Sequence, residues 1–577
     1  MGMNIRQAVS LKDAQQLRKS LKENSNPLIF SREHALAWRA FDLLMSQKLY
    51  GDADQLAKIL LPSYPEKIKL YICRLKALAS KGNLSEFELL LKQALRVRPK
   101  SYSLLCIGSR ELQMMGRYEL SLFYAKQCLG KKKATPKVYM TVLECQLACG
   151  LFDDSDHVFS QAFQMVDLQA TKSLASSKKK INSESKLLAL KKSLQKLKFQ
   201  HLGAHRIVEA RSLWSHRSIP KTYRCDVICI ASDEAPYLHE FIHHYLYLGF
   251  SNIFIGINNS SDQTHDFALK LAAADPRVHV ISTDDVHVEM TQRSSYSKLY
   301  LYAASITSSS YCLFVDVDEF WVAQPFPMNV EEYLEHFPDF DCLSCNWVNC
   351  FFEDEFSPPL TRALDFRLKR NVKSFVAYKS DLVELRCHAP VFRKPSARVL
   401  DAFGNPQSLI VTKIGFEAPG GILSSGKQFQ SESMVSVILH RHNRSILEYS
   451  YRMFKPHANQ VKYIGSASEP VVFKENRPGC NKITGKSIPT TFIDKLLPSG
   501  LESDYYQSLK CFIQSSGSAS EIEKARLQIS DQEIKRRISE VDQSILMQSR
   551  RVWQRGFSGT PYLEFLQERC KHNEEIE

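Results

Sequence analysis

CDVICIASDEAPYLHEFIHHYLYLGFSNIFIGINN, the stretch from Cys225 to Asn259, sets the fold of the central part of the chain. CDVICIA is a short apolar run rich in β-branched residues, which is typical of a buried strand. Ser232 or Asp233 can then cap a helix, Pro236 suits its first turn, and Gly249 ends it. FSNIFIGIN follows as a second apolar run. The stretch therefore predicts a strand, a helix and a second strand.

The same alternation continues downstream. SSDQTHDFALKLAAAD predicts a second helix, RVHVIST a third strand, YSKLYLYAASITSS a third helix and YCLFV a fourth strand. Strands that alternate with helices at this spacing indicate an α/β domain, in which a parallel sheet carries helices on both faces. In such domains ligands bind at the carboxyl ends of the strands.

Polar side chains collect at the predicted strand ends. Glu234 follows the first strand, Asn259 and Asp262 follow the second, and the fourth runs into DVDEF, which contains Asp316 and Asp318. Residues two apart in an extended chain point to the same side, so Asp316 and Asp318 can face one cation. Carboxylate oxygens suit Mg²⁺ or Mn²⁺, and these ions bridge the two phosphates of a nucleotide.

A family resemblance rests on these residues. The stretch DEAPYLHEFIHHYLYLGFSNIFIGINNSSDQT together with YCLFVDVDEFWV resembles the family 2-like and family 92-like glycosyltransferases of the GT-A fold. NWVNCFF, VKSFV, CHAPVF and LHRHNRSILEY continue the resemblance, although Arg441 and His442 depart from the family's His-Tyr-x-x-Lys-Ser segment. The resemblance implies a GT-A-type catalytic domain with a Rossmann-like, mostly parallel sheet.

The activity implied by the resemblance is the transfer of a sugar from a nucleotide-sugar donor to an acceptor hydroxyl on a glycan, a lipid-linked glycan or a protein. Mn²⁺ or Mg²⁺ held by Asp316 and Asp318 would neutralise the departing diphosphate. A distant imidazole often completes such a site. His440, at the end of the apolar run VSVIL, is our candidate, and His388 is the alternative.

The resemblance also implies residues that grip the donor and a residue that activates the acceptor. We assign donor binding to a group at the strand ends and ahead of the third helix: Glu234, Asn259, Asp262, Gln292 and Asp316. The family resemblance favours an inverting transfer, which needs a carboxylate as general base. Three acids in the loop FFEDEFSPP are the candidates for this base: Glu353, Asp354 and Glu355.

A competing motif lies on the first predicted helix. His239, Glu240 and His243 match H-E-x-x-H, in which two histidines hold zinc and the glutamate acts as base. The longer form of this signature, H-E-x-x-H-x-x-G-x-x-H with its third histidine ligand, is absent, whereas a more distant glutamate ligand stays open. We expect the match to be a coincidence and the histidines to be structural, which leaves a zinc metallohydrolase as a minor alternative.

A repeat precedes the α/β domain. Gly82, Gly116 and Gly150 are spaced 34 residues apart, each within a similar phrase, and Lys48 stands one period earlier. Thirty-four residues is the period of the tetratricopeptide repeat, a helix–turn–helix unit that binds protein partners. We expect an all-α solenoid of such repeats over about residues 30 to 168. An inert scaffold, in which only the repeats function, is the second alternative for the whole protein.

These patterns divide the chain into four parts: residues 1–168 with tetratricopeptide-like repeats, 169–220 as a basic helical linker, 221–460 as the glycosyltransferase domain, and 461–577 as a mainly helical C-terminal segment. The linker is lysine-rich and amphipathic. We expect it to be a solvated connector, with a peripheral contact to the inner face of a membrane as the alternative.

Composition adds limits on partners and location. Lysine and arginine exceed aspartate and glutamate by 76 − 62 = 14, which favours an anionic partner. No nucleic-acid recognition motif accompanies this charge, so we expect no nucleic-acid partner. The 15 cysteines form no regular framework, which indicates a reducing compartment, and no apolar run reaches the roughly 20 residues of a membrane span. We expect a cytoplasmic protein.

Overall fold

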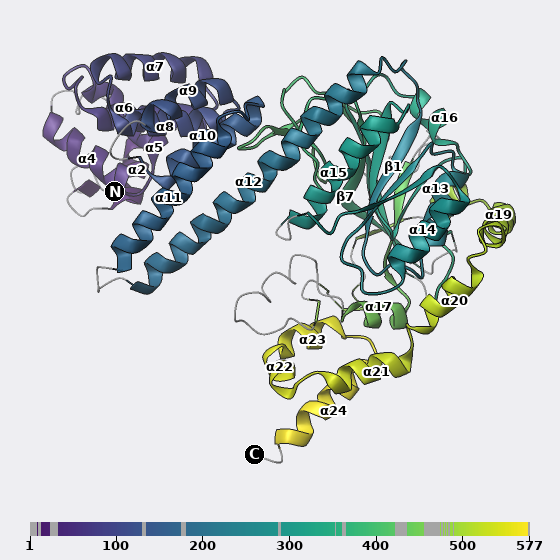
Figure 1. Cartoon of the computed structure of the whole chain (residues 1–577). Coiled ribbons are helices and arrows are strands. Elements are labelled where there is room, and N and C mark those ends of the chain that lie inside the picture. Colours follow the sequence, from purple (N-terminus) through teal and green to yellow (C-terminus); the bar gives the residue numbers. More distant parts are fainter. Residues whose placement is uncertain are drawn as a thin grey trace. The chain divides into compact units, whose positions relative to one another are not determined.

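The computed structural model of the chain (Figure 1) describes residues 8–9, 13–23, 33–129, 134–174, 180–286, 290–351, 354–360, 365–421, 436–454, 473–474, 477, 479–480, 482, 485–488 and 490–574. It has two compact units. The repeat unit comprises Met1–Lys198 and Val411–Gly415, and the sheet unit comprises Phe199–Ile410 and Phe416–Glu577. Within the described ranges, no helix is both long and apolar enough to cross a membrane.

The repeat unit is built from helix pairs. The first helices of the pairs begin at residues 34, 68, 102 and 136, which is a constant step of 34 residues: α4 (His34–Ser46), α6 (Ile68–Ser80), α8 (Tyr102–Met114) and α10 (Pro136–Cys149). Their partners are α5 (Tyr50–Leu60), α7 (Leu84–Val97), α9 (Tyr118–Leu129) and α11 (Ser155–Leu174). Each helix contacts the next, and α6, α8 and α10 also contact one another in turn. The predicted tetratricopeptide-like helical region is therefore confirmed.

The turns inside the pairs explain the glycine spacing. Gly82, Gly116 and Gly150 have φ values of +67°, +75° and +73°, which is the left-handed region that glycine enters without steric cost. Lys48, one period earlier, has φ +59° and therefore adopts the same conformation with a side chain. The 34-residue period thus reflects a turn that needs a left-handed residue, and the first repeat has Lys48 there instead of glycine.

The main sheet of the second unit has the strand order β3-β2-β1-β4-β7-β6-β13-β5. Its first half is parallel and consists of β3 (Val278–Ser282), β2 (Ile253–Ile257), β1 (Cys225–Ala231) and β4 (Tyr311–Asp316). Its second half consists of β7 (Asp365–Ala377), β6 (Cys342–Phe351), β13 (Ser436–Arg444) and β5 (Glu319–Ala323). Because β7 is antiparallel to both β4 and β6, and β5 to β13, the sheet is mixed, whereas a mostly parallel sheet was expected.

Helices cover both faces of the parallel half (Figure 1). On one face, α13 (Leu238–Tyr247) and α14 (Thr264–Ala274) pack with the strands in one apolar core. On the other face, α15 (Thr291–Ile306) and the end of α12 (Lys180–His216) form a second core against Ile228 and Phe254. Alternate residues of β1 and β2 enter opposite cores, as the strand period of two requires.

The remaining elements complete both units. Six strands are short: β8 (Leu382–Glu384), β9 (Val391–Phe392), β10 (Val399–Asp401), β11 (Ile410–Val411), β12 (Phe416–Glu417) and β14 (Lys486–Ser487). Helix α2 (Ala14–Glu23) packs on α4 in the repeat unit, and α16 (Val330–Glu335) packs into the main core of the sheet unit. The C-terminal helices are α17 (Ile446–Arg452), α18 (Thr490–Leu496), α19 (Leu501–Ser515), α20 (Ala519–Leu527), α21 (Asp531–Glu540), α22 (Gln543–Gln548), α23 (Arg550–Gly556) and α24 (Tyr562–Glu574). Helix α19 packs on α13, and residues from α17 and α21–α24 share one further apolar core.

Candidate functional site

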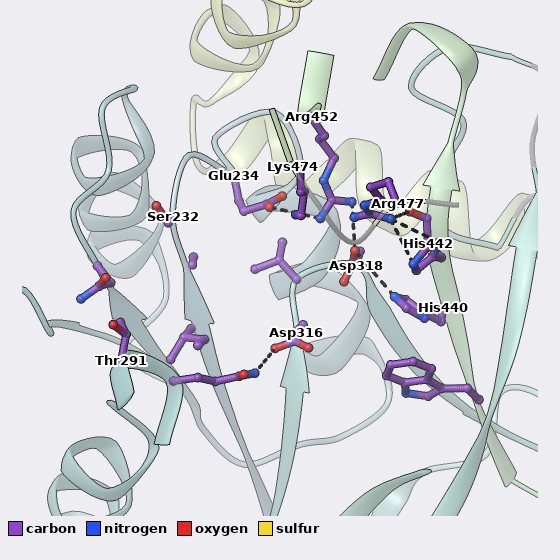
Figure 2. A pocket seen from close by; sticks show the side chains of 16 residues that line it. Ser232, Glu234, Thr291, Asp316, Asp318, His440, His442, Arg452, Lys474 and Arg477 are labelled. Carbon is purple, nitrogen blue, oxygen red and sulfur yellow. Dashed lines mark hydrogen bonds and ion pairs between the residues drawn. The ribbon is translucent and has the colours of Figure 1, made fainter. Parts of the chain in front are cut away.

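A cleft of about 380 Å³ opens at the carboxyl ends of β1 and β4 (Figure 2). The charged and histidine side chains that line it include Glu234, Asp316, Asp318, His440, Arg452 and Arg477. Figure 2 shows them pointing into one space from the β1–α13 connection, the end of β4 and the turn after it, the middle of β13, and α17 with the chain beyond it. The site therefore lies where the alternation of strands and helices places ligands.

Asp316 ends β4 and faces the cleft with a fully engaged carboxylate. Its Oδ1 accepts hydrogen bonds from Gln292 Nε2 and the Tyr296 hydroxyl, each at 3.2 Å. Its Oδ2 forms an ion pair of 2.9 Å with Lys373 Nζ. The side chain is still about a third exposed (34%), so it keeps access to a ligand. Strand and helix neighbours thus hold this carboxylate in one orientation.

Lys373 lies beneath the D-x-D segment and is buried. Its Nζ contacts Asp316 Oδ2 at 2.9 Å and Glu319 Oε2 at 3.0 Å. Burial on its own would lower the pKa of Lys373, but the Asp316 and Glu319 carboxylates raise this pKa well above its usual value. One lysine on β7 therefore contacts acids at both ends of the D-x-D-E sequence, although burial raises the pKa of Glu319 well above its usual value in spite of Lys373.

Asp318 is more deeply placed. Its Oδ2 forms an ion pair of 3.0 Å with Arg452 and lies 3.7 Å from His440 Nε2. Burial on its own would raise the pKa of Asp318, but the Arg452 guanidinium and the His440 ring hold this pKa well below its usual range. Asp318 is therefore ionised at neutral pH and carries its charge at a buried position in the wall of the cleft.

Two arginines hold Glu234 at the opposite wall. Arg444 forms an ion pair of 3.2 Å with Glu234 and stacks on Tyr237, with its guanidinium carbon 3.3 Å from the ring centroid. Arg452 lies 3.9 Å from the other carboxylate oxygen of Glu234. Arg452 thus bridges Glu234 and Asp318, which are 84 positions apart in the sequence.

Two histidines of β13 stand beside Asp318. The His440 ring lies 4.2 Å from the Trp347 ring and 5.1 Å from the His442 ring, measured between centroids. Burial lowers the pKa of His440, although Asp318 opposes this, so the ring is neutral near pH 7. Its buried Nδ1 has no hydrogen-bond partner among the described residues. His388, the alternative ligand, contacts Trp347 and the Val372 carbonyl and does not belong to the cleft lining.

These donors fit a divalent cation. Asp318 and His440 converge on one point, Asp316 faces the same cleft, and carboxylate and imidazole together suit Mn²⁺. No cluster of three or more His, Cys, Asp or Glu side chains is ready to hold a metal ion in the part of the chain that the structure describes. An ion here would therefore take phosphate oxygens and water for the rest of its ligands, as Mg²⁺ does in nucleotide sites.

The other predicted donor-binding residues divide into two groups. Glu234, Gln292 and Asp316 line the cleft, as does Asn258. Asn259 and Asp262 do not belong to its lining and instead shape the turn before α14. The Asn259 backbone N–H donates to Asp284 at 2.5 Å, and Asp262 accepts from the Thr264 backbone N–H at 2.9 Å.

The predicted general bases lie outside the cleft lining. Asp354 and Glu355 are exposed, and Glu353 falls outside the described residues. Their loop is nevertheless anchored near the site, because the Phe356 backbone N–H donates to Glu448 at 3.0 Å and Arg441 donates to the Ser357 carbonyl. The base assignment thus stays a prediction.

The H-E-x-x-H residues occupy a different environment, in the packing between α13 and the C-terminal helices. Glu240 is buried and paired with Arg526 at 2.8 Å and Arg441 at 3.2 Å. His243 is buried against α19, where its Nε2 lies 2.9 Å from the Ser508 hydroxyl. A glutamate held by two guanidiniums is poorly placed to activate a water molecule, so this geometry favours the structural interpretation of the motif.

Comparison with known proteins adds little. No protein-family model matches the chain, and no curated protein matches it. A solved structure titled "MamA MSR-1 C2" has 14% sequence identity, covers 28% of this chain and 92% of its own, and has a TM-score of 0.23. A thermophilic TPR protein from Thermus thermophilus has 19% identity, covers 32% of this chain and 90% of its own, and has a TM-score of 0.22. Both likenesses are too distant to carry an argument about function.

Sequence reasoning missed most of the cations at the site. These cations come from β7, β13, α17 and the chain beyond it: Lys373, Arg444, Arg452, Lys474 and Arg477. No spacing in the sequence ties them to Asp316. A lysine in the phrase VKSFV and a basic residue before Ser445 were visible signals. Their roles depend on partners that only the fold brings near.

Proposed function

We propose that the chain is a glycosyltransferase that moves a sugar from a nucleotide-sugar donor to an acceptor hydroxyl, with Mn²⁺ or Mg²⁺ at the D-x-D segment. The observation that supports this most is the convergence of Asp316, Asp318, His440 and Glu234 on one cleft at the carboxyl ends of parallel strands. The acceptor would be a glycan, a lipid-linked glycan or a protein. The repeat unit would bind a protein partner, because such arrays commonly do so.

Each residue has a physical role in this proposal. Asp318, His440 and Asp316 would hold the divalent ion, which when bound acts as a Lewis acid on the leaving diphosphate. Lys373 and Tyr296 keep Asp316 in place, so little reorganisation is needed when the donor arrives.

The same cleft offers groups for the rest of the donor. Glu234 and Gln292 would accept or donate hydrogen bonds to the base and ribose, since both line the cleft. Trp347 lines it as well, and its ring would offer an apolar face to a sugar. Asp354 or Glu355 would take the acceptor proton in an inverting transfer.

The test is nucleotide release from a panel of nucleotide-sugars with Mn²⁺, Mg²⁺ or chelator, for the wild type and Asp318→Asn. We expect one donor to be turned over with metal only, and a loss of roughly a hundredfold to a thousandfold in the variant, as for other lost electrostatic contacts to a leaving group. Asp266→Asn, an exposed aspartate on α14, is the matched control and should retain full activity. No turnover and no binding of any donor would refute the proposal.

An inert scaffold is the second candidate, and one observation favours it. Both carboxylates of the D-x-D segment are already neutralised by the protein itself, Asp316 by Lys373 and Asp318 by Arg452. A pseudo-enzyme would keep this arrangement as a structural charge network. It predicts that the wild type binds neither Mn²⁺ nor any nucleotide-sugar, while the repeat unit still binds its partner.

A further inference from the structure

Three cations form the wall of the cleft next to Asp318. Arg452 ends α17, and Lys474 and Arg477 follow in the chain beyond it. Figure 2 shows the three side chains together, with Arg452 and Arg477 directed towards the same region as Asp318. None belongs to the strand–helix alternation that supplies the acids. The C-terminal part of the sheet unit therefore adds a basic wall to an acidic strand end.

The positive charges of this wall lie close to one another. Arg477 is buried, and one of its Nη atoms donates to the His442 carbonyl at 3.0 Å. Burial lowers the pKa of Arg477 to about 10, and the neighbouring charge of Arg452 acts in the same direction. Two guanidiniums that disfavour each other in a partly closed cleft are stabilised by an anion placed between them.

Arg452 already contacts two carboxylates, but each of these carboxylates also has another partner. It contacts Asp318 at 3.0 Å and Glu234 only at 3.9 Å, and Glu234 has its shorter pair with Arg444. The ion pair with Asp318 also stands where a divalent cation would need that carboxylate. Arg452 and the cation thus compete for Asp318, and a ligand that draws Arg452 away would relieve the competition.

We propose that Arg452, Lys474 and Arg477 form a cradle for a diphosphate group, and that Arg452 is the internal counter-ion of Asp318 until the diphosphate binds. The proposal rests on the proposed function in taking this diphosphate to be that of the nucleotide-sugar donor. A diphosphate offers several anionic oxygens, which match the planar donors of two arginines and the point charge of a lysine. On binding, Arg452 turns from Asp318 to a phosphate oxygen and leaves the carboxylate to the cation.

The cradle predicts opposite effects of one substitution on two ligands. In Arg452→Gln, Asp318 has lost its counter-ion, so Mn²⁺ alone should bind about tenfold more tightly. The same variant has lost a charged donor, so inorganic pyrophosphate should bind about tenfold to a hundredfold more weakly. Arg477→Gln removes a cradle residue that does not touch Asp318, and should weaken pyrophosphate binding while leaving Mn²⁺ affinity within twofold.

The experiment uses the full chain and does not require knowledge of the donor base. Pyrophosphate binding is measured by titration calorimetry in the presence of chelator, and Mn²⁺ binding by electron paramagnetic resonance without nucleotide. Arg551→Gln, an exposed arginine on α23, is the matched control for the loss of one positive charge. Lys474→Gln is the second cradle variant if either arginine variant fails to fold, as judged by thermal unfolding.

The outcomes separate this inference from the proposed function. Pyrophosphate affinity within twofold of the wild type in the cradle variants, or Mn²⁺ affinity unchanged in Arg452→Gln, would overturn the cradle even if a donor is turned over. Loss of pyrophosphate binding with no donor turned over would keep the cradle and refute the transferase. We expect at least one nucleoside diphosphate among UDP, GDP, CDP and ADP to compete with pyrophosphate. Failure of all four to compete would overturn the assignment of the cradle to a nucleotide.

Discussion

The repeat unit and the sheet unit place their charges differently. In the repeat unit, buried Asp54 is paired with Arg74 and Lys58, whose side chains are 20% and 53% exposed, so its partners reach water. In the sheet unit, Lys373 and Glu319 are paired with both side chains at 1% exposure or less. Buried charge is expensive and is kept only where it is paired. The sheet unit therefore retains fully buried charge pairs, both beside the cleft and between α13 and the C-terminal helices, whereas the buried charge of Asp54 in the repeat unit is paired with side chains that reach water.

The largest effect is expected from breaking the charge cluster of the sheet unit. Lys373→Met leaves Asp316 and Glu319 without their shared cation, and should lower the free energy of unfolding by about 3–5 kcal/mol. Urea unfolding of the wild type and variant measures the difference. Lys373→Met combined with Glu319→Leu should recover part of the loss, because the unpaired buried carboxylate is gone. A single variant as stable as the wild type would mean that the cluster is not a charge network.

The repeat unit should instead be destabilised by a cavity in its apolar core. Leu112 on α8 is fully buried, so Leu112→Ala should destabilise the repeat unit by about 3 kcal/mol. Hydrogen exchange followed by mass spectrometry should show faster exchange in α8 and its neighbours. Because each repeat contacts mainly its neighbours, exchange in β1 and β4 should be unchanged. Equal acceleration in both units would show that they unfold as one.

Lowering the pH should change the stability of the two units differently. Burial lowers the pKa of His243 to about 4 and that of His244 to about 3, both on α13. A histidine in the unfolded chain has a pKa near 6.5. Below that pH the unfolded chain binds protons that the folded protein does not bind, so the free energy of unfolding falls. Between pH 7 and pH 5 each histidine should cost the sheet unit about 2 kcal/mol, with further loss down to its folded pKa.

Tryptophan fluorescence during urea unfolding at pH 7, 6 and 5 measures this loss. Four of the five tryptophans lie in the sheet unit and only Trp38 lies in the repeat unit, so the signal reports mainly on the sheet unit. His243→Gln removes one of the two histidines and should give a shallower pH dependence. A stability that does not change over this range would contradict the burial of these rings.

The smallest effect concerns the first turn of the repeats. Lys48→Gly relieves a left-handed backbone conformation that a side chain disfavours, and should raise the stability of the repeat unit by about 1 kcal/mol. Lys81→Gly, at the residue before the glycine of the next repeat, is the control and should not stabilise, because Lys81 has a right-handed conformation with φ −91°. Thermal unfolding of both variants measures the contrast.

Local patterns predicted a large part of the fold. The 34-residue spacing of glycines located the helix pairs, because the turn after each first helix needs a left-handed residue. The four apolar runs from Cys225 to Val315 became β1 to β4, because each is short, rich in β-branched or aromatic residues and separated from the next by a helix. Both signals are carried by residues near one another in the sequence.

The second half of the sheet was not predicted, for a physical reason. Strands β5 to β7 and β13 pair over long sequence separations and in both directions, and β7 joins the parallel half to the rest. Nothing local to Asp365–Ala377 specifies β4 as its partner. Pairing of this kind depends on register and on which faces are buried, and these are settled only when the whole sheet assembles.

The amino-acid sequence by itself determined which acids stand at the strand ends, because alternation and the D-x-D spacing are local properties. Only the tertiary structure decided how these acids and the other predicted site residues are used: Glu234, Gln292, Asp316, Asp318 and His440 meet in the cleft, whereas Asn259 and Asp262 shape a turn. Only the tertiary structure brought Lys373 and Arg452 to them. The strength of an ion pair depends on distance and burial, and for residues far apart in a chain both are products of folding.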